Sequence, residues 1–434
     1  MAELLTTFPT ESTAAPRAWG IARWGRADWA AIVIELLLVA IGVVFIYGAG
    51  VEVGGDMASK WHRQLLWTGL GAILYVTAAS VDYHKWARLS WGGYVLAVAL
   101  LFYVLIFGKT LNNTRGWLKI PGVGFLQPAE LAKPLTLLLL SWLGTRPALR
   151  HSSLGEWLPV LALGAVSGLP ILLVCLQPDT GTAMVFIPVT TTLIFLTGLR
   201  WRWFFLAGAL VLLAIPFAYT HLKPYQKDRV KVFLETPARS VAAGVATILP
   251  ESTGQKVTDS VEAFLTPAEG SHKPDDWNAV QSLLAVGSGG LTGKGYLHGT
   301  QHVLGYLPKT IAPTDFIFSV IAEETGFLGA VTLLGLMAAL MLCFFKTALD
   351  SPDRLGTFIA TGCAVMLTTH IIINISMTIR AAPIVGLPLP FVSYGGSFML
   401  GTMLLAGLVQ SVHIHRRQPA ERTSAAPQEE PDTE

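Results

Sequence analysis

The segment that decides the fold is the long apolar run "TDFIFSVIAEETGFLGAVTLLGLMAALMLCFFK", residues 314–346. A helix needs about 20 mostly apolar residues to cross a bilayer, and this run exceeds that length. We therefore expect it to project beyond the membrane or to bend near Gly326–Gly329. Asp315 stands at its start, and the pair Glu323–Glu324 lies inside it. At least one of these two glutamates must face protein or water, because lipid does not solvate a charge.

The composition of the whole chain agrees with a membrane protein. Of its 434 residues, 52% are hydrophobic and only 13% are charged, and the mean hydropathy is +0.54. Soluble proteins carry about 25% charged residues. The formal net charge of +2 is too small to indicate a nucleic-acid partner. Cys175, Cys343 and Cys363 lack metal or redox spacing, so we expect them to pack as small apolar residues.

Further apolar runs predict an all-α polytopic membrane protein with about ten transmembrane helices. The expected spans are 29–49, 63–82, 90–108, 128–144, 156–176, 181–199, 202–220, 314–346, 356–378 and 391–413. The predicted regions are a cytoplasmic segment 1–28, helices 1–7 within 29–220, a large extracytoplasmic loop 221–313, helices 8–10 within 314–415, and a cytoplasmic tail 416–434.

The large loop and the tail have compositions unlike those of the spans. Residues 236–278, rich in Pro, Gly, Ser, Thr and Ala, are typical of surface loop with one short amphipathic helix near Val257–Leu265. The tail, rich in Pro, Glu and Ala, is expected to be disordered.

Lys and Arg in the short loops predict the orientation, because cytoplasmic loops carry an excess of them. With the N-terminus inside, the cytoplasmic segments hold Arg17, Arg23, Arg26, Lys85, Arg88, Arg146, Arg150, Arg200, Arg202, Lys346, Arg354, Arg416, Arg417 and Arg422. The short external loops then hold Lys60, Arg63, Lys109, Arg115, Lys119 and Arg380. This excess favours both termini in the cytoplasm and loop 221–313 outside.

Four polar clusters then fall on the external side. The first is "NNTRGWLKIPGVGFLQPAELAK", residues 112–133, in which Glu130 and Lys133 are three apart and can pair on one helix face. Lys133 lies about one turn inside the membrane, which favours a functional role over a snorkelling lysine beside a helix cap. The second is "CLQPDTGTAMVF", residues 175–186. There Asp179 is the expected N-cap of the sixth span, with a second role toward the site left open.

The third cluster is the glycine-rich stretch "QSLLAVGSGGLTGKGYLHGTQ", residues 281–301. It is either a flexible, turn-rich loop or a segment whose amides and Lys294 hold phosphate-like oxygens. The fourth is the start of the eighth span, where Thr314 or Asp315 is expected to cap the helix.

Taken together, these clusters resemble the SEDS family of bacterial shape, elongation, division and sporulation proteins. The matching motifs are "TRGWL", "QPAELAK", "QPDTGTA", "QSLLAVGSGGLTGKG", "TDFIFSVIAEETGFLG" and "GLPLPFVSYGGS", in the family's order over about residues 30–415. The stretch "GKGYLHGTQ" is more similar to the RodA elongation branch than to the FtsW division branch.

The resemblance implies ten membrane helices and polymerisation of lipid II into β-1,4-linked glycan strands at the outer face of the bacterial cytoplasmic membrane. It implies a role in elongation and rod shape beside a class B penicillin-binding protein and elongation-complex proteins. The family's essential aspartate corresponds to Asp315. Glu130, Lys133 and Asp179 are implied to line or support the same cavity.

The chain departs from the family pattern in three places. Before Asp315 it reads "LPKTIAPTD", with Lys309 and Pro313 where the family has Glu and His, and with two extra residues. Ala129 stands where serine is common, and residues 236–270 form an apparent insertion. The first change puts the local geometry at Asp315 in question.

The chemistry expected from the resemblance is attack of a sugar hydroxyl on a pyrophosphate-activated sugar. Asp315 is the candidate general base, and Lys133, Arg115 and Lys294 are candidates to support the leaving group. A divalent cation, Mg²⁺ or Mn²⁺, held by carboxylates is compatible with this chemistry, although no metal signature can be read from the spacing. Two alternatives use the same groups: a lipid II flippase and a non-catalytic scaffold for wall-synthesis enzymes.

Overall fold

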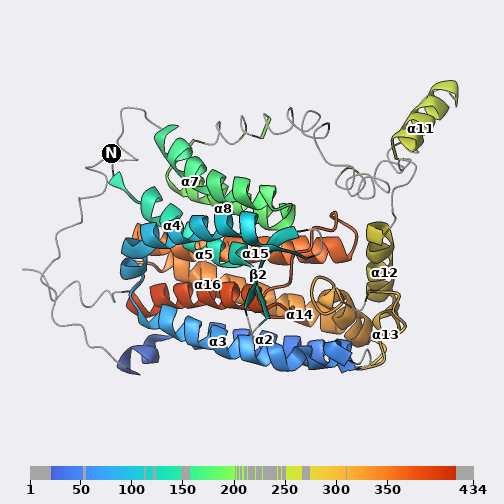
Figure 1. Ribbon diagram of the computed structural model, residues 1–434, viewed down its shortest axis with the longest axis horizontal. Coiled ribbons are helices and arrows are strands. Elements are labelled where there is room, and N and C mark those ends of the chain that lie inside the picture. The colour runs from blue at the N-terminus through green and yellow to red at the C-terminus, as the bar shows by residue number, and fades with distance from the viewer. Residues whose placement is uncertain are drawn as a thin grey trace, which may run out of the picture.

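The computed structural model describes residues 21–51, 55–111, 114–120, 124–147, 157–200, 251–265, 274–308 and 310–416, with isolated positions between 202 and 246. Its long helices lie side by side along one direction (Figure 1). Helices α12 (Pro274–Ser288) and α13 (Thr300–Val303) lie together at one end of this bundle, which we call the α12 end.

The long helices match nine of the ten predicted spans. They are α2 (Trp29–Val51), α3 (Lys60–Ser80), α4 (Tyr83–Phe107), α5 (Pro128–Gly144), α7 (Trp157–Leu176), α8 (Thr180–Leu196), α14 (Ile317–Leu349), α15 (Arg354–Thr378) and α16 (Gly396–His415). Within the described residues, six are long and apolar enough to cross a membrane: α2, α4, α7, α14, α15 and α16. The multi-pass, all-α prediction is confirmed, and the span predicted at 202–220 lies outside the continuously described segments.

Two predicted helix starts are wrong for local reasons. Helix α4 begins at Tyr83 rather than 90, because the side chain of Asp82 accepts a hydrogen bond from the His84 amide (3.0 Å) and caps the helix there. Helix α16 begins at Gly396 rather than 391, because the residues before it form turns. Short 3-10 helices, η1 (Ile21–Arg26) and η2 (Gly55–Ser59), precede α2 and α3.

Helix α14 differs from the prediction at its start and agrees with it in the middle. Its N-cap is Phe316, with no side-chain hydrogen bond, so the predicted capping by Thr314 or Asp315 is wrong. The hydroxyl of Thr314 donates instead to the carbonyl of Ile311 (3.1 Å). The expected bend is confirmed at Gly326, whose φ of 68° and ψ of −165° break the helix.

A small antiparallel sheet, which the sequence did not predict, joins α4 to α5. Its strands are β1 (Lys109–Leu111), β2 (Thr114–Ile120) and β3 (Gly124–Leu126), in the order β1-β2-β3. Thr110 pairs with Arg115, and Leu118 pairs with Leu126. The two outer strands have three residues each, too few to show a period-two pattern.

The predicted large loop contains more helix than expected. Helix α11 (Glu251–Leu265) confirms the short helix near Val257–Leu265 and begins six residues earlier. Helix α12 was read as surface loop and turn, which is wrong for residues 274–288, and it packs against α14 and α15. Most of the apparent insertion at 236–270 and all of the tail after Arg416 lie outside the described residues.

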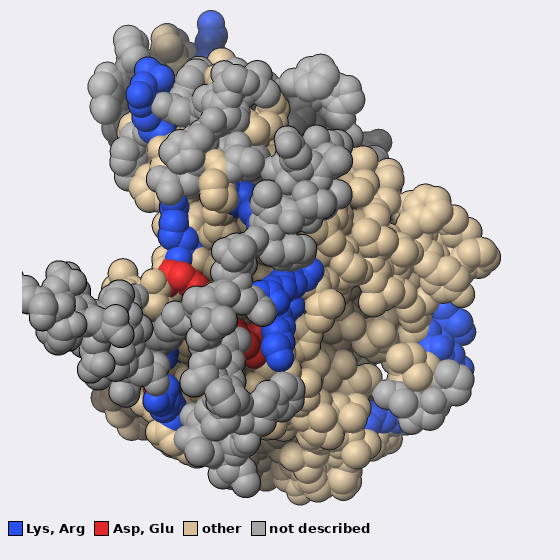
Figure 2. Space-filling model, turned by 90° about the vertical axis from the view of Figure 1, so that its left-hand side faces the viewer, with Lys and Arg blue, Asp and Glu red and all other residues tan. Residues whose placement is uncertain are grey.

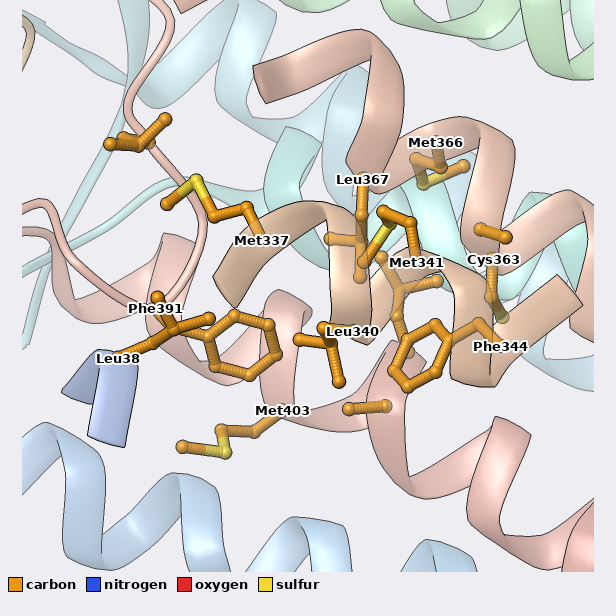
Figure 3. Packing of buried hydrophobic residues seen from close by; sticks show 14 of the residues in the cluster. Leu38, Met337, Leu340, Met341, Phe344, Cys363, Met366, Leu367, Phe391 and Met403 are labelled. Carbon is orange, nitrogen blue, oxygen red and sulfur yellow. The ribbon is translucent and has the colours of Figure 1, made fainter. Parts of the chain in front are cut away.

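The buried core lies along α14. Figure 3 shows Met341 and Phe344 of this helix next to Leu367 and Cys363 of α15. Cys363 is fully buried, as its expected packing role requires, whereas Cys175 is exposed, so the packing prediction is wrong there. The three cysteines are free thiols.

The end of the molecule opposite α12 carries mostly basic side chains among its charged residues (Figure 2). Figure 2 views the molecule from the end opposite α12, and the coloured side chains there are mostly Lys and Arg, with few Asp and Glu. One exposed ion pair, between Arg416 after α16 and Asp350 after α14 (3.2 Å), involves the last residue described.

Candidate functional site

Asp315 lies half-buried in a turn directly before α14, and its backbone is held by this turn and by helix α15. Its amide donates to the carbonyl of Ile311 (3.0 Å), and its own carbonyl accepts a hydrogen bond from the Asn374 side chain on α15 (2.9 Å). Asn374 also donates to the carbonyl of Leu387 (2.7 Å). The backbone that carries the carboxylate is therefore held in place by these hydrogen bonds.

The motif "GLPLPFVSYGGS", residues 386–397, holds the segment before Asp315 from the other side. The Ser393 hydroxyl donates to the carbonyl of Thr314 (2.6 Å), and the Tyr394 amide donates to the carbonyl of Pro313 (2.9 Å). Both contacts use backbone carbonyls, which every residue type offers. The unusual residues before Asp315 therefore leave this support intact, although Lys309 itself is outside the described residues.

Glu130 and Lys133 form the predicted ion pair on the first turns of α5, and they are deeply buried. The Lys133 ammonium lies 2.8 Å from Glu130 Oε2 and 2.9 Å from Oε1, and the two residues are only 2% and 4% exposed. Pro128 at the first helical position fixes where α5 begins, which puts both side chains on one face.

A third group, which the sequence reading missed, completes the surroundings of Lys133. Nε2 of His370 on α15 lies 2.9 Å from the Lys133 ammonium, and His370 is 2% exposed. The ring of Phe398 on α16 has its centroid 5.6 Å from the same ammonium. Three helices therefore converge on this one charge.

Asp179 is the N-cap of α8, as predicted, and it has a second contact. Its Oδ1 accepts from the Thr182 amide (3.1 Å), and its Oδ2 accepts from the Gln127 side chain (2.6 Å). The amide of Gln127 donates to Ser397 Oγ (2.7 Å). Asp179, the start of α5 and the motif 386–397 are thus joined, so three of the four predicted clusters meet around this motif.

Lys294 belongs to a separate cluster on the first half of α14. Its ammonium donates to Glu323 Oε1 (2.6 Å) and to Thr300 Oγ1 (2.7 Å). Glu323 also accepts from the amides of Thr300 (2.8 Å) and Gln301 (3.1 Å). Glu323 therefore faces protein, as its depth required. In the described part, Lys294 makes no hydrogen bond or ion pair with Glu130, Lys133 or Asp179.

The glycine-rich stretch has a role that neither sequence reading foresaw: it pairs with α14 where Gly326 breaks that helix. The amides of Lys294 and Gly295 donate to the carbonyls of Glu323 (3.1 Å) and Glu324 (2.9 Å). In return, the Phe327 amide donates to the carbonyl of Gly290 (2.8 Å). A broken helix exposes backbone groups that must find partners away from water, and this stretch supplies them.

Replacement of Gly293 by alanine should destabilise the protein strongly. Gly293 has φ of +82°, and a Cβ there would strike the carbonyl of Glu324. We expect the free energy of unfolding to fall by about 2–5 kcal/mol. The left-handed backbone conformation should cost alanine about 1–2 kcal/mol, and the clash of its Cβ should cost about 1–3 kcal/mol. Equilibrium unfolding of the detergent-solubilised protein measures this change in stability. Gly287→Ala on α12, where nothing lies within 4 Å of the added Cβ, is the matched control. Equal stability of the two variants would contradict the assigned role of Gly293.

Arg115 lies on β2, and its side chain is used at the end of α4. Its Nη2 donates to the carbonyl of Ile106 (2.6 Å), and its Nε lies 3.4 Å from the carbonyl of Gly108. This is the place where a cation complements the negative end of a helix. In the described residues Arg115 makes no ion pair with the buried Glu130–Lys133 cluster.

The functional candidates that sequence reasoning missed are His370 and Asn374. They are four residues apart, so they lie on the same face of α15. Polar side chains inside an apolar span are candidate functional groups by default, and this pair could have been recognised on that ground alone. Within the described residues, no group of three or more His, Cys, Asp or Glu side chains is arranged to hold a metal ion.

The family of cell cycle proteins that comprises FtsW, RodA and SpoVE matches residues 28–418. This chain belongs to the FtsW/RodA/SpoVE family. The family assignment confirms the SEDS resemblance and accounts for the order of the six motifs.

Relatives within the FtsW/RodA/SpoVE family match over nearly their whole length. The peptidoglycan glycosyltransferase RodA of Treponema pallidum (strain Nichols) is 29% identical over 438 residues, covering 90% of this chain and 98% of the relative. The peptidoglycan glycosyltransferase MrdB of Escherichia coli (strain K12) is 31% identical over 394 residues, covering 89% and 93%.

The fold is also similar to solved structures of the family. One is a chain in the structure described as "Structural coordination of polymerization and crosslinking by a peptidoglycan synthase complex". It is 28% identical, with a TM-score of 0.69, and the match covers 90% of this chain and 99% of that one.

Proposed function

We propose that this protein is a peptidoglycan glycosyltransferase that polymerises lipid II into β-1,4-linked glycan strands for cell elongation and rod shape. Lipid II is a disaccharide pentapeptide linked to undecaprenyl pyrophosphate. The proposal rests on one observation: three predicted clusters come together around residues 386–397. They are the segment that carries Asp315, the buried Glu130–Lys133 pair, and Asp179. The relatives from Treponema pallidum and Escherichia coli are both named as peptidoglycan glycosyltransferases.

The orientation we propose places both termini in the cytoplasm and the α12 end outside the bacterial cytoplasmic membrane. The basic face opposite α12 supports this, because positive charge accumulates on the cytoplasmic side (Figure 2). Asp315 at the start of α14 then lies toward the outer face, where the sugars of lipid II stay in water while the polyprenyl tail lies against apolar helices.

In the proposed reaction, Asp315 is the general base. The 4-hydroxyl oxygen of GlcNAc attacks C1 of MurNAc, and the bond between C1 and the pyrophosphate oxygen breaks. The hydroxyl proton passes to the Asp315 carboxylate, and the bonding electron pair leaves with undecaprenyl pyrophosphate. Attack from the opposite face inverts the anomeric centre. An alcohol is a poor nucleophile, so a positioned carboxylate is the group this step requires.

The leaving pyrophosphate needs cationic support more than a proton. Lys133 is our main candidate because it carries the buried charge at the centre of the cluster. Glu130 orients Lys133 directly, and Asp179 holds Gln127 at the start of the same helix. Arg115 and Lys294 remain predicted substrate ligands. Each would have to release a protein partner before it could bind a phosphate oxygen.

A divalent cation, if one takes part, should arrive with the substrate's pyrophosphate, because the described residues hold no preformed cluster for it. We expect EDTA to reduce glycan synthesis more than tenfold and Mg²⁺ or Mn²⁺ to restore it. The melting temperature of the lipid-free protein should stay unchanged. A lower melting temperature on chelation would show that the protein itself holds a structural ion, against this expectation.

We propose a class B penicillin-binding protein and elongation-complex proteins as partners. The similar structure in which polymerization and crosslinking are coordinated supports a crosslinking partner for this chain as well. Such a partner would join the strands that this protein releases at the outer face.

The decisive experiment uses purified protein in liposomes with lipid II, alone and with its cognate penicillin-binding protein. Glycan chains on a gel are the expected product. Movement of lipid II between leaflets without chains would instead indicate a flippase. If both preparations showed neither glycan chains nor movement of lipid II, the protein would be a scaffold. The flippase outcome and the scaffold outcome would each refute the proposed activity.

A further inference from the structure

His370 is a buried residue of the site to which the proposed mechanism assigns no role. It lies on α15, 2% exposed, with Nε2 2.9 Å from the Lys133 ammonium. It lies beside Lys133 of α5, which is itself paired with Glu130, and beside the ring of Phe398 of α16, whose centroid is 5.0 Å from that of His370.

The contact defines the state of the imidazole. A lysine ammonium has three N–H donors and no acceptor, so Nε2 must accept and the ring must be neutral, with its proton on Nδ1. Two of the three donors point to the oxygens of Glu130, and His370 takes the third. Lys133 is thus fully satisfied, and the direction of its third N–H bond is set by α15.

Asp315 is held by the next turn of the same helix. Asn374, four residues after His370, donates to the backbone carbonyl of Asp315 (2.9 Å). Residues four apart lie on one helix face. One face of α15 therefore holds the buried cation through His370 and the segment of the carboxylate through Asn374.

We propose that His370 is a positioning residue: as a neutral acceptor, it fixes the Lys133 ammonium relative to Asp315 through their common attachment to α15. The inference rests on the proposed glycosyltransferase function. His370 is also the partner that Lys133 can exchange for a phosphate oxygen at least cost. Release of Glu130 would leave a buried charge unpaired, whereas release of a neutral ring does not.

The test compares two variants of nearly equal shape. His370→Gln keeps an acceptor at the end of the side chain, and His370→Met replaces it with a thioether, which is a weak acceptor. We expect kcat of His370→Met to fall roughly 100-fold, the cost of a misplaced catalytic group, with KM for lipid II within twofold. His370→Gln should recover most of kcat. A residue that only fills space would not distinguish these variants.

Spectroscopy on the unliganded protein gives an independent readout. The ¹⁵N spectrum of the histidine ring should show a protonated Nδ1 and an unprotonated, hydrogen-bonded Nε2, and Lys133→Met should shift the Nε2 signal. Equal kcat in His370→Met and wild type, equal loss in both His370 variants, or a protonated Nε2 would each overturn the proposal. Lack of glycan from the wild type would instead refute the glycosyltransferase function, and the ring signal would still test the contact.

Discussion

Asp315→Asn should reduce the rate of glycan synthesis by about 10²–10⁴-fold, the usual contribution of a general base. Asparagine has the shape of aspartate but cannot accept the proton of the attacking hydroxyl. Two hydrogen bonds that fix this segment use the backbone of Asp315, through Ile311 and Asn374, so the variant should keep both. Folding stability should therefore change little. The rate is measured with purified variant and lipid II in liposomes.

The control for this substitution is the same chemical change at the other end of the molecule. Asp350→Asn alters an exposed aspartate whose carboxylate lies 3.2 Å from Arg416. An exposed ion pair contributes little, about 0–1 kcal/mol, so this variant should polymerise at the wild-type rate. A stable Asp315→Asn protein that is as active as Asp350→Asn would end the assignment of Asp315 as the base.

The spans were predictable because crossing a bilayer imposes a length and an apolar composition that can be counted. The predicted span 128–144 coincides with α5, since Gln127-Pro128 marks its start. The start of α4 was missed because the helix begins directly after its N-cap, Asp82, and so includes the polar residues that precede its apolar part. Hydropathy detects only the apolar part of a helix, whereas the capping residue determines where the helix begins.

The partners inside the site were much harder to predict. The pairing of Glu130 with Lys133 follows from helix spacing, which is local in sequence. The contact between Lys133 and His370 joins residues 237 positions apart, and only the packing of α5 on α15 creates it. In the same way, the glycines near Lys294 could not be explained before the break at Gly326 was known to need partners.

Lys133→Met should destabilise the protein by about 3–5 kcal/mol and abolish polymerisation. Removal of the ammonium leaves the carboxylate of Glu130 buried without a counter-charge, which is among the most costly changes in a protein interior. The same change removes the cation proposed to support the leaving pyrophosphate. Unfolding in detergent measures the first effect and the lipid II assay the second.

The double variant Glu130→Leu/Lys133→Met separates these two effects. Replacement of both partners by apolar residues of similar size removes the unpaired charge, so stability should return to within about 1 kcal/mol of wild type. Activity should not return, because no cation remains beside His370. If the double variant were as stable as wild type and also polymerised lipid II, the pair would be a structural element of the bundle alone. The support of the leaving group would then have to come from Lys294 or Arg115.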